Sequence, residues 1–421
     1  MNINSLPRHV LLEIFKFCVD DIDHEDGWHT LVHVCREWRD VVFSSPRWLR
    51  LELRCTNKNP VEELLDVWPA LPIVIDALIT TSRRSGLTNI MAALKRHDLV
   101  CRIKIRRVPN SLLKSPAMKQ QFPQLTDLTL RSNKENAPAI PDSFLDGSAP
   151  RLRSLDFKGI TSLFPALGKL LFSTTDLVTF RLWDIPNSGI ISSDLIVTSL
   201  STLTKLRELF IGFRSPRSRA DRERQHPTLF KRLVLPSLTE FYFKGDSEYL
   251  EDIVGRMDAP ELETVTITFF NQLVFDTPLL CDFFSRTEVL QEPYQADVTL
   301  SRSHIKFTLS QREGMTDCPM LEVVISSSVL EWQLSSLAQF CSTSLPPLPT
   351  LKCLSISTNF LMGPESTDDM ETVLWLELLS PFIAVKDLIL VGSLVQYVAP
   401  VLGEITREGG PKVYLRCGTF S

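Results

Sequence analysis

LTDLTL at residues 125–130 recurs in loose form as LRSLDF at 152–157, LVTFRL at 177–182, LRELFI at 206–211, LTEFYF at 238–243 and LETVTI at 262–267. The first residues of successive copies lie 24 to 32 positions apart. Later copies are LEVVIS at 321–326, LKCLSI at 351–356 and VKDLIL at 385–390. Apolar and polar residues alternate within each copy, which predicts a strand with one buried face. Proline precedes most copies and would end the element before the strand.

A period of this length with an L-x-x-L-x-L core is the signature of leucine-rich repeats. Apolar stripes between the copies predict helices, as at 250–257 and 334–341. We therefore predict an α/β solenoid over 121–421, with parallel strands on its concave face and helices on its convex face. Residues 56–120 read as irregular first repeats or a linker, with strands at 72–79 and 102–107. The alternating stretch at 296–309 predicts a hairpin inserted in the array.

Amino-acid composition and net charge indicate which class of protein this is. The 421 residues are 44% hydrophobic and 23% charged, with a formal net charge of -5, which is typical of a folded protein that binds neither nucleic acid nor a membrane. Nine scattered cysteines without a C-x-x-C pair indicate buried free thiols and a cytoplasmic or nuclear location. Residues 412–417 read as a further strand without a polar capping repeat, which is typical of an array that has been cut short.

The first 55 residues follow a helical period instead. Apolar stripes run through LPRHVLLEIFKFC at 6–18 and LVHVCREWRDVVFSSPRW at 31–48, and Pro46 ends the second stripe. These two stretches resemble the F-box, whose pattern is a Leu-Pro start, an apolar helix ending in Ile-Phe, Val-Cys-Arg-x-Trp-Arg and a late Trp. His9, Cys18 and a long acidic loop between the stretches depart from that pattern.

The resemblance implies a three-helix module that docks to the Skp-type adaptor of a cullin ubiquitin ligase. The residues it assigns to that contact are Leu6, Pro7, Val10, Leu11, Ile14, Phe15, Leu31, Val34, Cys35 and Trp38. An F-box followed by such repeats is similar to substrate receptors of SCF-type ligases, and LWDIP at 182–186 adds a similarity to F-box proteins of mushroom-forming fungi. The resemblance supplies no substrate.

The concave face of the predicted solenoid is a second candidate surface, which would bind an unknown protein substrate. Side chains between and just after the last two apolar positions of each copy should face the inner curve. They include Arg131, Asp156, Lys158, Arg181, Trp183, Phe210, Tyr242, Lys244, Thr266 and Ser355. Exposed aromatic and arginine side chains are enriched at binding hot spots. The alternative is that Trp183 and Phe210 tuck under neighbouring loops.

Other candidate sites are weaker. The basic segment at 213–227 favours a solvated loop over an anion site because Asp221 and Glu223 dilute its charge. His24, His29 and His33 lack the spacing and partners of a zinc site, and no phosphate loop or nucleophile elbow occurs. We therefore expect no enzyme, no metal and no cofactor. A repeat scaffold without ligase docking is the first alternative, and a site assembled between distant repeats is the second.

Overall fold

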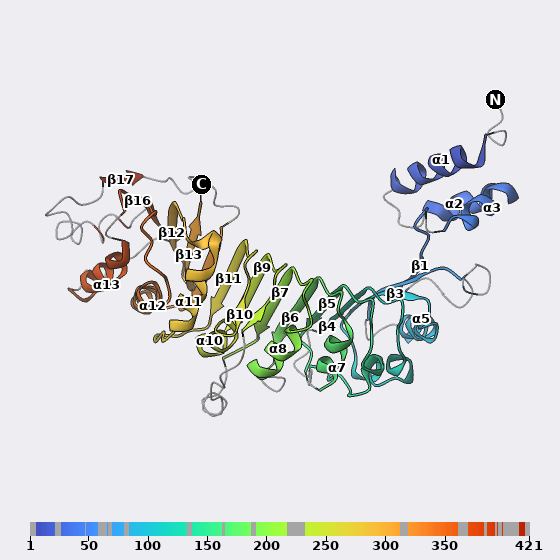
Figure 1. The fold of residues 1–421 in the computed structure, drawn as a ribbon, viewed down its shortest axis with the longest axis horizontal. Coiled ribbons are helices and arrows are strands. Elements are labelled where there is room, and N and C mark those ends of the chain that lie inside the picture. The colour runs from blue at the N-terminus through green and yellow to red at the C-terminus, as the bar shows by residue number, and fades with distance from the viewer. Residues whose placement is uncertain are drawn as a thin grey trace. The chain divides into compact units, whose positions relative to one another are not determined.

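The structure is a computed structural model of all 421 residues. It describes residues 6–21, 27–46, 48–57, 65, 70–79, 84–132, 137–161, 165–186, 191–216, 232–311, 319–360, 369–382, 385–391, 394, 398 and 412–416. The chain divides into two compact units, residues 1–174 and 175–421. The fold in both is mixed α/β, built from parallel strands and helices (Figure 1).

Unit 1 begins with three helices, α1 (Arg8–Asp21), α2 (Gly27–Val34) and α3 (Arg36–Ser44). A five-stranded parallel sheet follows, in the order β1 (Leu53–Cys55), β2 (Ile73–Leu78), β3 (Val100–Arg106), β4 (Asp127–Arg131) and β5 (Ser154–Lys158). Its connections contain α5 (Arg84–Lys95), α6 (Asn110–Leu113), α7 (Ala166–Ser173) and the 3-10 turns η2 (Pro116–Lys119) and η3 (Phe144–Gly147). The strands predicted at 72–79 and 102–107 are β2 and β3.

Unit 2 is likewise built from strands that alternate with helices. Its sheet runs in the order β6 (Thr179–Ile185), β7 (Glu208–Phe213), β9 (Glu240–Gly245), β11 (Thr264–Phe269), β14 (Leu321–Ser326), β13 (His304–Ser310), β12 (Gln295–Leu300), β15 (Cys353–Thr358), β16 (Asp387–Val391) and β17 (Lys412–Arg416). The connecting elements are α8 (Ser193–Leu200), α10 (Ser247–Val254), α11 (Pro278–Arg286), η5 (Glu288–Leu290), α12 (Leu330–Thr343), α13 (Asp369–Leu379) and η6 (Ser380–Phe382). A small second sheet pairs β8 (Leu233–Val234) with β10 (Met257–Asp258).

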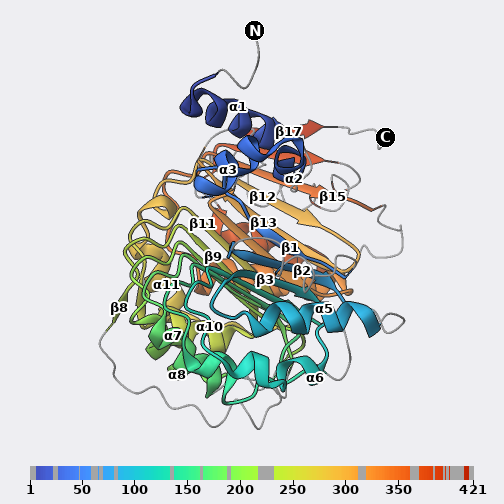
Figure 2. The same ribbon diagram turned by 90° about the vertical axis from the view of Figure 1, so that its right-hand side faces the viewer.

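The helices of unit 2 lie on one side of its strands. Figures 1 and 2 both show α8, α10 and α11 on the same side of β7, β9 and β11. The opposite face of this sheet, which we call the open face, carries every second side chain of each strand. The apolar motif residues point the other way, toward the helices, and Leu209 and Ile267 are fully buried there, as is Leu250 of α10.

All nine copies of the sequence motif form strands. Eight strands begin two residues after the first residue of their motif, and β14 begins on its own first residue, Leu321. In those eight copies the first residue is buried before the strand starts, as Leu125 and Leu262 show. Backbone N–H groups at this turn donate to the previous repeat, for example Arg207 to Val178 and Glu263 to Thr239, both at 2.9 Å or less. These backbone hydrogen bonds join each repeat to the one before it, as expected of leucine-rich repeats.

The stretch at 296–309 forms the predicted hairpin. Strands β12 and β13 pair antiparallel, with Ala296 opposite Leu309 and Val298 opposite Phe307. β13 also pairs antiparallel with β14, while β12 pairs parallel with β15, so the hairpin fills a place in the sheet. The hairpin therefore lies between β14 and β15, whereas β11 pairs directly with β14 across the 59-residue gap between the motif copies at Leu262 and Leu321.

Candidate functional site

The three N-terminal helices pack around a small apolar core. Leu11 and Phe15 of α1, Trp28 of α2 and Val42 of α3 are at most 1% exposed. The Phe15 ring lies 4.6 Å from the Trp38 ring, centroid to centroid. The core explains why large side chains recur in this short stretch.

Three residues that the resemblance assigned to the adaptor contact belong to this core instead. Leu11, Phe15 and Leu31 are 1%, 0% and 7% exposed, so they cannot contact another protein directly. The physical reason is helical spacing. Leu11 and Phe15 are four residues apart and form one stripe of α1, which faces α2 and α3.

A second apolar stripe of α1 remains open. Val10, Ile14 and Phe17 follow each other at spacings of four and three residues, which places them on one side of the helix. Val10 and Ile14 are half-buried, and Phe17 is 71% exposed. Pro7 is exposed at the start of this helix, and its carbonyl accepts the N–H groups of Val10 and Leu11. Sequence reasoning missed Phe17, although its spacing from Val10 and Ile14 was a sufficient signal.

Val34 extends the open apolar surface to α2, whose last residue it is, with 58% of it exposed. Leu6 is half-buried and lines a hollow of about 430 Å³ with Arg8 of α1 and Asp40 of α3. We call Leu6, Pro7, Val10, Ile14, Phe17 and Val34 the helical open stripe. Exposed apolar side chains gathered on neighbouring helices often mark an interface.

The Val-Cys-Arg-x-Trp-Arg motif has a local structural role. The sequence predicted one continuous stripe from Leu31 to Phe43, but the chain turns at Cys35 and begins a new helix. The thiol of Cys35 caps α3 by accepting the N–H of Trp38 at 3.4 Å. Arg39 donates from Nε to the carbonyl of Val32 at 3.0 Å. Cys35 and Trp38 are both half-buried, so the motif fixes the angle between α2 and α3 and leaves part of itself exposed.

In unit 1, charged side chains on the strands neutralise each other. Arg131 of β4 pairs with Asp156 of β5, with 2.5 Å between Nη2 and Oδ2, and Arg102 pairs with Glu52. Asp156 is only 5% exposed, which differs from the prediction that it faces a substrate. It is buried because the register places β4 directly beside β5, where Arg131 covers it. Asp156 therefore orients Arg131, which is exposed, and Lys158 is half-buried on the same strand.

Three aromatic rings meet on the open face of unit 2. Trp183, Phe210 and Tyr242 stand on β6, β7 and β9, and their centroids lie 5.1 to 5.6 Å apart. Each ring is half-buried, and the other two rings supply part of its cover. The guanidinium of Arg181 lies 4.6 Å from the Phe210 centroid and pairs with Glu208. We call Trp183, Phe210 and Tyr242 the aromatic cluster.

Two backbone features bring the rings together. β6 and β9 are separated by β7, so their backbones lie about 10 Å apart. Gly212 of β7 carries no side chain that would stand between them, and the Tyr242 ring comes within 3.9 Å of where its Cβ would be. β6 also bulges after Leu182, where Asp184 has a φ of 48°, and this shifts Trp183 out of regular register. Burial raises the pKa of the Tyr242 hydroxyl, which also shares a hydrogen bond with Thr268.

The other predicted open-face residues are present there but do not gather. Lys244 and Thr266 are half-buried next to the cluster, and Thr266 pairs in register with Tyr242. Ser355 of β15 is half-buried five strands further along the sheet, counted from β9 through β11, β14, β13 and β12. The basic segment beyond residue 216 and His24 lie outside the described residues.

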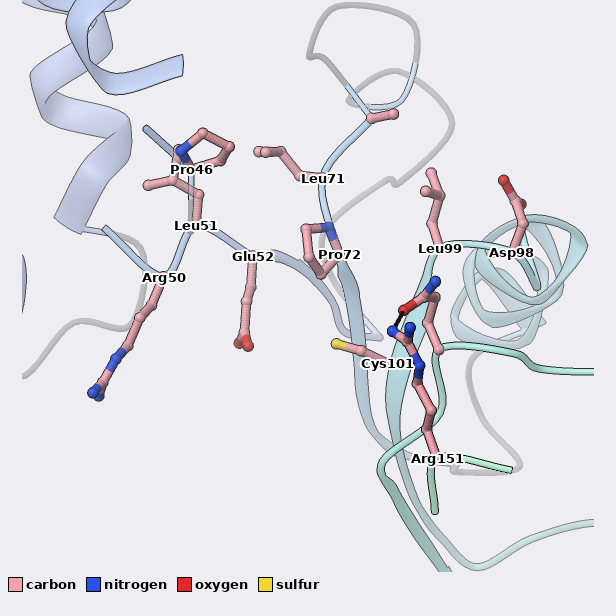
Figure 3. Close-up of a pocket in the computed structure, with 12 residues that line it drawn as sticks. Pro46, Arg50, Leu51, Glu52, Leu71, Pro72, Asp98, Leu99, Cys101 and Arg151 are labelled. Carbon is pink, nitrogen blue, oxygen red and sulfur yellow. Dashed lines mark hydrogen bonds between the residues drawn. The ribbon is translucent and has the colours of Figure 1, made fainter. Parts of the chain in front are cut away.

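A hollow of about 770 Å³ opens in unit 1 (Figure 3). Pro46, Leu51, Leu71 and Pro72 supply apolar lining, and Cys101 lies at its wall. Several of its polar side chains already have partners, since Glu52 pairs with Arg102 and Arg151 donates to Gln124. Burial raises the pKa of the Cys101 thiol to about 11, so it stays protonated at neutral pH. Among these lining residues the hollow offers no activated nucleophile.

No group of three or more histidine, cysteine or acidic residues that could hold a metal ion occurs among the described residues. In the same part of the chain, every helix is too short or too polar to cross a bilayer.

Comparisons with known proteins give one structural likeness. No protein-family model matches the chain. No curated protein matches it. Among solved structures it is similar to the leucine-rich repeat-containing protein LegL7 from Legionella pneumophila, at 15% identity and a TM-score of 0.33, over 87% of this chain and 91% of that chain. A likeness at this level carries no argument about function, so the repeat assignment rests on the nine motif-bearing strands.

Proposed function

We propose that this chain is a protein-interaction scaffold that works as the substrate-recognition adaptor of an SCF-type ubiquitin ligase. The helical open stripe docks to a Skp-type adaptor, and the open face of the repeats captures a protein substrate. The chain performs no bond chemistry itself. It raises the effective concentration of a substrate lysine near the charged conjugating enzyme.

The observation that carries the proposal is the second apolar stripe of α1. A helix that serves only its own core needs one apolar stripe, and Leu11 and Phe15 already provide it. Ile14 and Phe17 add a stripe that the described part of unit 1 leaves uncovered, with Phe17 71% exposed. The stripe includes Pro7 and Val34, which also match the F-box pattern.

The size of the stripe suits a docking surface. Burying a large apolar side chain contributes about 1.5 to 3 kcal/mol. Phe17, Val34 and Ile14 together could supply several kcal/mol, part of which is lost to the entropy of association. That balance is consistent with a micromolar to nanomolar dissociation constant.

Co-purification tests the docking. We would express the full chain with a Skp-type adaptor and compare wild type with the Phe17→Asp, Val34→Asp double variant. A matched control exists in Phe172→Asp, Val274→Asp, because Phe172 and Val274 are 51% and 67% exposed outside the helices α1–α3. The helical variant should lose the adaptor while the control keeps it. Equal retention by both variants would refute docking through this stripe.

A repeat scaffold without ligase docking is the second candidate. It is favoured by the burial of Leu11, Phe15 and Leu31, three residues that the F-box resemblance assigned to the contact. In that case wild type itself would fail to retain the adaptor, while the open face would still bind its protein partner.

A further inference from the structure

Strand β9 displays a row of three chemically different side chains on the open face. Glu240, Tyr242 and Lys244 alternate with the buried residues Phe241 and Phe243. Glu240 is exposed, and Tyr242 and Lys244 are half-buried. An anion, an aromatic ring and a cation therefore stand in line on one strand.

The two charges of this row are unpaired, unlike those around them. Arg181 is neutralised by Glu208, and Lys306 by Glu322 at 3.1 Å. Neither Glu240 nor Lys244 has an ion pair within the part of the chain that the structure describes. The Lys244 ammonium lies near an aromatic ring, with its Nζ 5.9 Å from the Phe270 centroid.

We propose that this row, with the aromatic cluster beside it, binds an extended segment of a partner protein that has an apolar residue between a basic and an acidic one at alternate positions. The inference rests on the proposed function, in which the open face captures substrate, and it names the kind of segment captured. The apolar side chain contacts Trp183 and Tyr242. Its basic neighbour pairs with Glu240, and its acidic neighbour pairs with Lys244.

The spacing fits such a segment. Lys244 lies four residue steps along the strand from Glu240, which corresponds to about 13 Å. Residues two positions to either side of a central residue span the same length in an extended peptide. Each charge on the partner therefore lies opposite its counterpart while the central side chain lies over the rings.

The cluster is suited to anchor the central side chain. Its rings already contact each other across Gly212, with Phe210 and Tyr242 stacked at an interplanar angle of 21°. Rigid aromatic side chains lose little conformational entropy on binding, and buried aromatic anchors dominate many interfaces. The flanking charges then select among apolar segments, which is the usual contribution of interface electrostatics.

Charge also disfavours a polyanionic ligand here. Glu208 and Glu240 stand directly opposite each other in register on β7 and β9. Arg181 neutralises Glu208, so the carboxylate of Glu240 is the one that would repel a nucleic acid or a segment with several phosphates. A mixed-charge segment meets no such penalty.

Selection of peptides from a random heptapeptide phage library tests the proposal. The full chain would be immobilised, and the Trp183→Ser, Tyr242→Ser variant would serve for counter-selection. Wild type should enrich peptides with an apolar residue flanked two positions away by Lys or Arg on one side and Asp or Glu on the other. Glu240→Lys should shift the selection to acidic residues on both sides, and Lys244→Glu to basic residues on both sides, each by at least ten-fold. Glu261→Lys, an exposed charge change outside the strands, should leave the selection unchanged.

Three results would overturn the proposal: no enrichment over the double variant, enrichment that ignores the charge reversals, or enrichment of wholly acidic peptides. Thermal unfolding of each variant would check that the exposed substitutions preserve the fold. Adaptor co-purification is measured separately, so a failed selection with retained docking would refute this inference alone.

Discussion

The carboxylate of Glu251, in α10, lies 2.6 Å from the backbone nitrogen of Leu280 in the first turn of α11. Its second oxygen accepts the N–H of Leu279 at 3.0 Å. One repeat therefore caps the helix of the next repeat with a side chain that is only 8% exposed. Burial raises the pKa of Glu251 to about 7, and Asp276 and Asp252 add to the rise, while the two N–H groups oppose it.

This carboxyl predicts a pH-dependent stability. Between its usual pKa of 4.5 and about 7 the folded state holds a proton that the unfolded state has lost. The free energy of unfolding should therefore fall as pH rises through this window. Glu251→Gln keeps an oxygen that accepts an N–H and removes the titration. Relative to wild type, the variant should gain on the order of 1 kcal/mol between pH 5 and pH 8.

Urea unfolding of wild type and of Glu251→Gln at the two pH values measures this gain. Subtracting one free energy of unfolding from the other removes the contribution of the carboxyl groups that both proteins share. Glu248→Gln, exposed on the same helix, is the matched control and should show no such gain. If Glu251→Gln and Glu248→Gln respond equally to pH, the buried cap does not control this dependence.

The alternation of apolar and polar residues within each motif copy explains why the sequence predicted so much of the fold. Each motif copy carries its own strand signal, so all nine strands could be placed from residues within six positions of one another. The cap at Glu251 was not predictable in this way, because its partner at Leu280 belongs to the next repeat. The burial of Asp156 beneath Arg131 likewise depends on the register between β4 and β5.

In the candidate sites, too, some features could be predicted from one motif copy and others depend on neighbouring strands. Trp183, Phe210 and Tyr242 were expected on one face because they hold equivalent positions in three motif copies. Their direct contact depends on the absence of a large side chain at Gly212 and on the bulge of β6, which no single motif reveals. In α1 the pattern predicted a single apolar stripe that includes Ile14, and it did not show that Ile14 and Phe17 would remain at least partly exposed.

The two apolar stripes of α1 predict a large loss of stability from truncating one phenylalanine and almost none from truncating the other. Phe15 is fully buried against Trp38, so Phe15→Ala should destabilise the helices α1–α3 by about 3 to 5 kcal/mol. Phe17 is 71% exposed, and Phe17→Ala should change stability by no more than about 0.5 kcal/mol. Amide hydrogen exchange over residues 8–44 of the full chain measures both effects. Equal protection in the two variants would show that the stripes are not divided between core and surface.

Alanine substitutions at two glycines on neighbouring strands should change the stability of the fold in opposite directions. A Cβ on Gly245 would lie 2.6 Å from Cζ of Phe243 and 3.0 Å from Cδ2 of Phe213. Both rings are buried and pack edge to face, at 6.4 Å between centroids, so neither can swing into solvent. Gly245→Ala should therefore cost about 1 to 3 kcal/mol through overpacking.

Gly212→Ala is the matched substitution. Its Cβ would meet nothing closer than 3.7 Å, which is ordinary van der Waals contact. Replacing glycine where the backbone tolerates alanine reduces the entropy of the unfolded chain and stabilises by about 0.4 to 1 kcal/mol. The midpoint of urea unfolding should fall for Gly245→Ala and stay level or rise for Gly212→Ala. A fall of similar size in both would mean that the Phe243 and Phe213 rings do not set the limit at β9.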